Sequence, residues 1–142
     1  MRKEATSLRD TIGNEDEYGP GGVLFSLRQR CFSITANKYT YELCMFDKAE
    51  QRESGVKKGS GTSLGSWVGS SIEETSGMMV FKWTNGLKCW NGPNRSATAF
   101  VTCGTHTTVI SADEPNICEY EFKMESMVAC DDNFKKFHNI AD

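Results

Sequence analysis

The stretch from Lys88 to Tyr120 carries side chains that could bind a polar ligand. It offers a guanidinium at Arg95, a carboxylate at Glu114 and a phenol at Tyr120, and the amide of Gln51 earlier in the chain can both donate and accept hydrogen bonds. If these groups converge, they discriminate between sugar epimers, because a hydroxyl that points the wrong way leaves a buried partner unpaired. We therefore predict a sugar-binding site.

Each of these residues also has a purely structural interpretation. Arg95 and Glu114 could form a salt bridge at a strand end. Trp90 could cover the apolar face of a sugar or support the arginine, but a tryptophan beside a cysteine also commonly packs on a disulfide. Tyr120, two residues after Cys118, could pack on a disulfide in the same way. Residues 94–96 match the glycosylation sequon, which we expect to be unused because a glycan on Asn94 would crowd Arg95.

Catalysis has no comparable support in the sequence. A glycosidase needs two carboxylates that face each other across a bond, and neither Glu73-Glu74 nor Asp131-Asp132 is marked out as such a pair. No recognisable set of nucleophile and base is present, and no glycine-rich loop leads into a helix as a phosphate site requires. The sequence favours binding without chemistry, and without a cofactor.

Composition limits the protein further. A chain of 142 residues with 38% hydrophobic content can bury one modest core, and a net charge of −3 argues against a nucleic-acid partner.

No apolar run reaches the roughly 18 residues that span a bilayer, and no signal-peptide core follows Met1. The six cysteines have neither zinc-site nor thioredoxin-type spacing, so we predict no metal site and three disulfides formed in an oxidising compartment. We therefore expect a fragment of a longer secretory-pathway protein.

The pattern of the chain changes after a breaker cluster at residues 18–22. Residues 1–17 have helical spacing and are predicted to be the end of a helical or coiled-coil segment, with a disordered tail as the alternative. We place one domain at 18–131 and a C-terminal tail at 132–142.

Short strands with turn punctuation fill the predicted domain. Residues 47–63 are polar and are predicted to form an exposed loop with Gln51 near its start, and Asn85-Gly86 is predicted to close a hairpin. This pattern indicates an all-β fold, either a flattened β-barrel or a two-sheet β-sandwich. The strands are expected at residues 23–27, 30–35, 39–46, 64–72, 78–83, 87–90, 97–103, 107–110 and 118–124.

Several ordered motifs resemble the mannose 6-phosphate receptor homology (MRH) domain, and the glucosidase II beta-subunit branch of that family looks most similar. The motifs are Tyr18-Gly-Pro20, Tyr39-Thr-Tyr41-Glu-Leu-Cys44, Gln51, Thr62-Ser-Leu-Gly65, Cys89-Trp-Asn-Gly-Pro-Asn-Arg-Ser96 and Glu114-Pro-Asn-Ile-Cys-Glu-Tyr120. The resemblance implies a flattened β-barrel with three disulfides, pairing Cys31 with Cys44, Cys89 with Cys118 and Cys103 with Cys130, among the many connectivities open to six cysteines.

The resemblance also implies a ligand and a setting. Terminal mannose is expected to be bound by Gln51, Arg95, Glu114 and Tyr120, with Trp90 beside the arginine and Tyr39 lining the pocket. No basic cluster stands near the motif, so unphosphorylated mannose of a high-mannose N-glycan is the expected ligand. For this branch the implied role is a non-catalytic lectin in the endoplasmic reticulum lumen that promotes glucose trimming by the catalytic alpha subunit of glucosidase II. The alternatives are the gamma subunit of the lysosomal-enzyme phosphotransferase and a protein-interaction domain that does not bind sugar.

Overall fold

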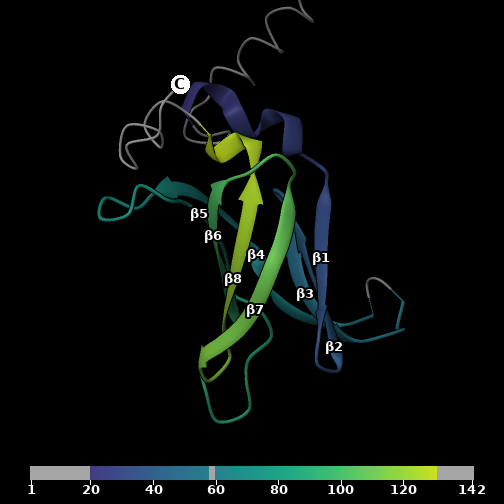
Figure 1. The fold of residues 1–142 in the computed structure, drawn as a ribbon. Coiled ribbons are helices and arrows are strands. Elements are labelled where there is room, and N and C mark those ends of the chain that lie inside the picture. Colours follow the sequence, from purple (N-terminus) through teal and green to yellow (C-terminus); the bar gives the residue numbers. More distant parts are fainter. Residues whose placement is uncertain (1–19, 58–59, 131–142) are drawn as a thin grey trace, which may run out of the picture.

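The computed structural model describes residues 20–57 and 60–130. Within them, eight strands form one sheet in the order β1-β2-β3-β4-β5-β6-β8-β7, which curls until its edge strands β1 and β7 lie side by side (Figure 1). The all-β, barrel-like prediction is confirmed, as one hydrogen-bonded sheet. The strands are β1 (Cys31–Ala36), β2 (Tyr39–Cys44), β3 (Lys48–Glu53), β4 (Thr62–Ile72), β5 (Met79–Thr84), β6 (Ser96–Cys103), β7 (Thr108–Asn116) and β8 (Glu119–Ser126).

The β1–β2 hairpin follows directly from its sequence. A two-residue turn joins the strands, and Asn37 takes the positive φ of 59° that such turns require and that asparagine tolerates. The strand period of two then turns Tyr41 and Leu43 toward the core and leaves Thr40 and Glu42 on the other face.

The last three strands bring distant parts of the chain together. Strand β8 lies between β6, to which it is parallel, and β7, to which it is antiparallel. The parallel register pairs Ser96 with Glu119 and Ala97 with Tyr120. This pairing sets the start of β6, and with it Arg95, beside the start of β8.

Large apolar side chains fill the barrel. Trp83, Phe81 and Phe122 are almost fully buried, and Trp67 packs on Trp83 edge to face with a centroid separation of 5.4 Å. The indole N–H of Trp83 donates to the carbonyl of Cys44 at 3.1 Å, so this buried polar atom is satisfied. The core therefore fixes β2 against β5 across the interior.

Three disulfides close the fold, and no cysteine among the described residues is free. They join Cys31 to Cys44, Cys89 to Cys118 and Cys103 to Cys130, the pairing that the family resemblance implies. The second disulfide ties the loop before β6 to the turn between β7 and β8.

The predicted strand at 23–27 is wrong, because this segment belongs to the 3₁₀ helix η1 (Pro20–Leu27). Leu24 and Leu27 are both buried, and their spacing of three residues fits the 3₁₀ period. A second short 3₁₀ helix, η2 (Met127–Ala129), follows β8. Among the described residues, no helix is both long enough and apolar enough to cross a bilayer.

The predicted loop at 47–63 is also wrong in its first half, where β3 pairs with β2 and β4. Ala49 is its one fully buried apolar side chain, so the strand has no apolar alternation to reveal it. It is stabilised instead by Arg52, whose Nη1 lies 2.6 Å from Glu42 and 2.9 Å from Glu50. These carboxylates raise the pKa of Arg52 above its ordinary value, and the hydrogen bond that Arg52 donates to Glu42 is the largest contribution.

The expected hairpin at Asn85-Gly86 does not form, and residues 87–90 are not a strand. The next strand in the chain that pairs with β5 is β6, and residues 85–95 between them form a loop with one isolated bridge between Lys88 and Asn94. Gly86 has a packing role, since a Cβ there would lie 2.6 Å from backbone atoms of Ser63 and Leu64.

The remaining strand predictions hold, although β7 extends to Asn116 where the sequence predicted an end at 110. The predicted segments at 1–17 and 132–142 lie outside the described residues. The predicted domain bounds of 18 and 131 therefore stay predictions.

Candidate functional site

The predicted binding residues come from four elements near one end of the barrel. Gln51 lies in β3, Arg95 directly precedes β6, Glu114 lies in β7 and Tyr120 in β8. The loop 85–95 and the β7–β8 turn meet at the lower end of the barrel in Figure 1, while η1 lies at the upper end. The structure thus gathers side chains that are far apart in the sequence.

Tyr120 lies at the buried centre of this group, with only 6% of its surface exposed. Burial raises the pKa of its phenol above the ordinary value, the hydrogen bond to Arg95 opposes that shift, and the nearby carboxylate of Glu114 adds to it. The phenol is therefore neutral at physiological pH, and its hydroxyl can both donate and accept.

Arg95 is held by the loop that precedes it. Its Nη1 donates to the carbonyl of Leu87 at 3.2 Å and to that of Lys88 at 3.3 Å. Its Nε is buried and has no hydrogen-bond partner among the described residues. Buried donors are nearly always paired in folded proteins, so this N–H offers a position for an acceptor supplied by a ligand.

Glu114 is fixed by the turn that connects β7 to β8. One carboxylate oxygen accepts from the backbone N–H of Cys118 at 2.6 Å, and Cys118 has a positive φ of 62° while bonded to Cys89. A carboxylate has further acceptor capacity on both oxygens, and the Glu114 side chain is exposed. Within the described residues it forms no ion pair with Arg95, contrary to the structural interpretation of this pair.

Gln51 completes the group through a residue that the sequence analysis did not single out. Its Nε2 donates to the hydroxyl of Tyr41 at 3.3 Å, and the two residues are register partners on β3 and β2. The ring of Tyr41 lies 6.1 Å from that of Tyr120 and 5.5 Å from that of Phe122. The sequence signals for Tyr41 were its place in the motif Tyr39-Thr-Tyr41-Glu-Leu-Cys44 and its place on the core-facing side of an alternating strand, and neither marked it as a residue of the site.

The other two predicted residues, Trp90 and Tyr39, are more exposed. Trp90 is 88% exposed, so its indole is not packed into the core as the disulfide interpretation required. Tyr39 is 39% exposed, and its ring lies 6.4 Å from that of Tyr41. The residue types and positions of the group fit a polyhydroxyl ligand better than an ion or a flat apolar molecule.

A cavity of about 560 Å³ lies at the other end of β2, away from this group. It contains none of the predicted binding residues, and its charged groups, Arg28 and Asp47, are exposed. We therefore do not assign the sugar site to it. Its lining consists of Arg28, Gln29, Cys31, Cys44, Met45, Phe46 and Asp47.

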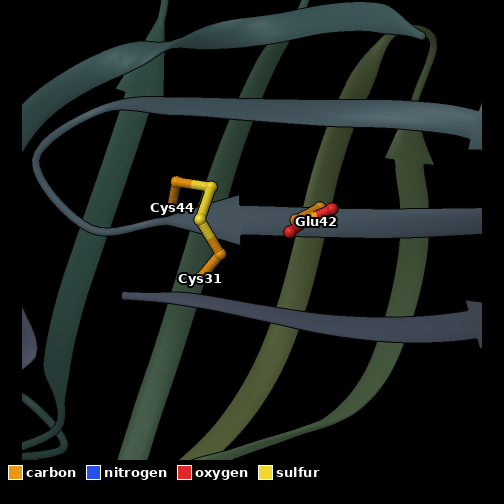
Figure 2. A group of neighbouring side chains, drawn as sticks. All are labelled: Cys31, Glu42 and Cys44. Atoms are coloured by element: carbon orange, nitrogen blue, oxygen red, sulfur yellow. A yellow bond between two sulfur atoms is a disulfide. The ribbon is translucent and has the colours of Figure 1, made fainter. Parts of the chain in front are cut away.

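Cys31, Glu42 and Cys44 lie close enough together to suggest a metal site, but their chemistry does not fit one. Figure 2 shows the two sulfur atoms joined as a disulfide between β1 and β2, with Glu42 on the same hairpin. A disulfide has no thiolate to offer a metal, and Glu42 already pairs with Arg52.

Comparison with known proteins gives consistent matches. The family model for glucosidase II beta subunit-like proteins matches residues 1–141. The chain is 39% identical to human glucosidase 2 subunit beta over 117 residues, covering 80% of this chain and 21% of the relative. It is 35% identical to the same subunit from Oryza sativa subsp. indica over 132 residues, covering 93% of this chain and 20% of the relative. The chain thus spans about a fifth of the length of these relatives.

The structural comparison agrees. A crystal structure of the MRH domain of glucosidase II beta bound to mannose aligns with a TM-score of 0.58 and 31% identity, over 75% of this chain and 99% of that one. The human N-acetylglucosamine-1-phosphotransferase subunit gamma, which represents the alternative raised from the sequence, is 25% identical over 108 residues, covering 75% of this chain and 35% of the relative.

Proposed function

This chain is an MRH domain and belongs to the family of glucosidase II beta subunit-like proteins, and we propose that it binds terminal, unphosphorylated mannose on high-mannose N-glycans. The binding residues in this proposal are Gln51, Arg95, Glu114, Tyr120, Trp90 and Tyr39. The relative whose MRH domain is described as bound to mannose shares its fold with this chain at 31% identity, which supports the ligand class.

The observation that carries the proposal is the fixed, partly unsatisfied guanidinium of Arg95. Its buried Nε lacks an acceptor among the described residues, and its neighbour Tyr120, whose pKa it lowers, is buried. A sugar hydroxyl placed here would accept from Nε and lie beside the phenol and the Glu114 carboxylate. A hydroxyl in the wrong orientation would leave the charged donor unpaired, which is the physical basis for choosing one epimer.

The charges around the group support a neutral ligand over a phosphorylated one. Asp113 on β7 and Glu121 on β8 are register partners, and Glu119 lies two residues before Glu121 on β8. All three are exposed and lie close in sequence to Glu114 or Tyr120. Glu119 and Glu121 lie on the outer face of β8, opposite the buried Tyr120, and with Asp113 they add negative charge to this edge of the barrel, which disfavours a phosphate group there.

We further propose that the domain acts by recruitment and not by catalysis. In the endoplasmic reticulum lumen it would hold the mannose arm of a glycoprotein glycan, while the catalytic alpha subunit of glucosidase II trims glucose from another arm. Tethering raises the effective concentration of the reacting end, so a weak contact with one sugar suffices.

A glycan array tests this proposal, using the oxidised wild type, Glu114→Gln, and Glu74→Gln as a matched control. Glu74 is also an exposed glutamate, but it lies in the turn between β4 and β5. We expect the wild type and Glu74→Gln to bind unphosphorylated mannose-terminated glycans and Glu114→Gln to lose that binding. Preference for phosphorylated glycans would favour the phosphotransferase gamma role, and no binding by any form would favour a protein-interaction domain.

A further inference from the structure

Tyr41 occupies a position that links the two walls of the candidate site. It lies on β2, next to Gln51 on β3, whereas Tyr120 and Arg95 belong to β8 and the start of β6. These strands are far apart in the sheet order and face each other only because the sheet closes. Tyr41 touches both sides, through a hydrogen bond on one and ring packing on the other.

The hydrogen bond fixes the amide of Gln51. An isolated glutamine side chain rotates freely and can present its oxygen or its nitrogen to a ligand. Here Nε2 donates to the Tyr41 hydroxyl at 3.3 Å, which leaves Oε1 free to accept and the second N–H free to donate. The orientation of the amide is therefore set before a ligand arrives.

The ring of Tyr41 is itself held firmly. It meets Phe122 edge to face at 5.5 Å and Tyr120 at 6.1 Å, while Tyr39 lies 6.4 Å away. Phe122 is almost completely buried, so this packing anchors Tyr41 to the core. The phenol hydroxyl is consequently presented to Gln51 from a rigid support.

We propose that Tyr41 is a positioning residue that orients the Gln51 amide for mannose and thereby contributes to sugar affinity without acting as a primary ligand. This inference rests on the proposed mannose-binding function. It predicts that the hydroxyl of Tyr41 acts through Gln51, so that its contribution disappears when Gln51 is removed.

A double-mutant cycle tests the inference with wild type, Tyr41→Phe, Gln51→Ala and the double variant, each titrated with methyl α-mannoside by calorimetry. Tyr41→Phe keeps the ring packing and removes only the hydroxyl. We expect it to weaken binding by about two- to tenfold, the range for one neutral hydrogen bond. In the Gln51→Ala background the same change should have no further effect. Equal losses in both backgrounds, or wild-type affinity for Tyr41→Phe, would overturn the proposal.

Thr40→Val is the matched control for loss of a hydroxyl on β2. Thr40 is adjacent to Tyr41, and its hydroxyl bonds to that of Thr35 at 2.9 Å on the exposed side of the hairpin. This variant should bind as the wild type does. Thermal melts of all variants separate loss of folding from loss of orientation.

The side-chain amide of Gln51 provides a readout that does not need sugar. In ¹⁵N NMR spectra of the free domain, its resonances should shift and exchange faster with solvent in Tyr41→Phe but not in Thr40→Val. Unchanged resonances would refute the orienting role even if the protein bound no mannose. A wild type that fails to bind mannose, with the amide shift present, would contradict the proposed function and leave the structural role of Tyr41 established.

Discussion

Arg95→Lys is the substitution that most sharply tests how the site works. Lysine keeps the positive charge but has a single ammonium group in place of the planar fork. In the structure, Nη1 of Arg95 donates hydrogen bonds to the carbonyls of Leu87 and Lys88 at 3.2 and 3.3 Å, while the buried Nε has no partner among the described residues. One ammonium can replace the contacts to the loop or reach a ligand, but it cannot do both.

The expected loss of mannose affinity follows from the number of hydrogen bonds that lysine cannot replace. A hydrogen bond to a charged group contributes about 1.5–3 kcal/mol, and each 1.4 kcal/mol corresponds to about tenfold in affinity. Losing one such bond to the sugar should therefore weaken mannose binding by about ten- to a hundredfold. Because the lysine ammonium can still donate to the carbonyls of Leu87 and Lys88, the melting temperature should change little.

Calorimetric titration with methyl α-mannoside, paired with thermal melts, measures both quantities. Arg28→Lys is the matched control, since Arg28 is an exposed arginine stacked on Phe25 at 4.0 Å near the other end of the barrel. It should leave the affinity unchanged. Mannose affinity within twofold of wild type in Arg95→Lys would refute the argument that the guanidinium fork binds the sugar.

Three further outcomes are expected. Burial raises the pKa of Tyr120 above its ordinary value of 10.0, so the folded state holds this proton more tightly than the unfolded state does, and the resulting stability is complete below pH 10 and is lost as the pH rises through the raised pKa. Thermal melts of wild type and Tyr120→Phe between pH 8 and 11 should therefore show a steeper alkaline decline in melting temperature for the wild type. Replacing Cys89 and Cys118 with serine opens a loop with a sequence separation of 29, which should lower the free energy of unfolding by about 3–4 kcal/mol in denaturant titrations. The same change should weaken mannose binding, because the loop that holds Arg95 is no longer bonded to the β7–β8 turn. Arg52→Gln leaves two carboxylates facing each other in register, so the melting temperature should fall and partly recover at high salt; a variant as stable as wild type would contradict the role given to this ion-pair network.

The sequence predicted best where local chemistry decides the structure. The two strands of the β1–β2 hairpin and most later strands were predicted close to their observed bounds, because short runs of strand-forming residues alternate with turn residues along the chain. Strand β3 was missed because it has one fully buried apolar residue, Ala49, and is held by Arg52, which pairs with Glu42 on β2 and with Glu50 on β3 itself. Strands of this kind depend on tertiary contacts that local periodicity does not encode.

For the candidate site, the sequence likewise predicted the residue types but not how they come together. Residue types indicated a group suited to hydroxyls, but the convergence of Arg95 with Tyr120 depends on the parallel register of β6 and β8. The part played by Tyr41 was hidden for a related reason, since a core-facing tyrosine on a strand is usually a packing residue. Only the closure of the sheet brings it between Gln51 and Tyr120.

The central claim is that mannose binds where these side chains converge, and an NMR titration of the domain with methyl α-mannoside tests it most directly. The account predicts saturable shifts at Arg95, Tyr120, the Gln51 side-chain amide and the turn at Cys118. The amides of Arg28 and Asp47, at the cavity near the other end of β2, should not move. Shifts confined to that cavity, or none at saturating sugar, would contradict the account.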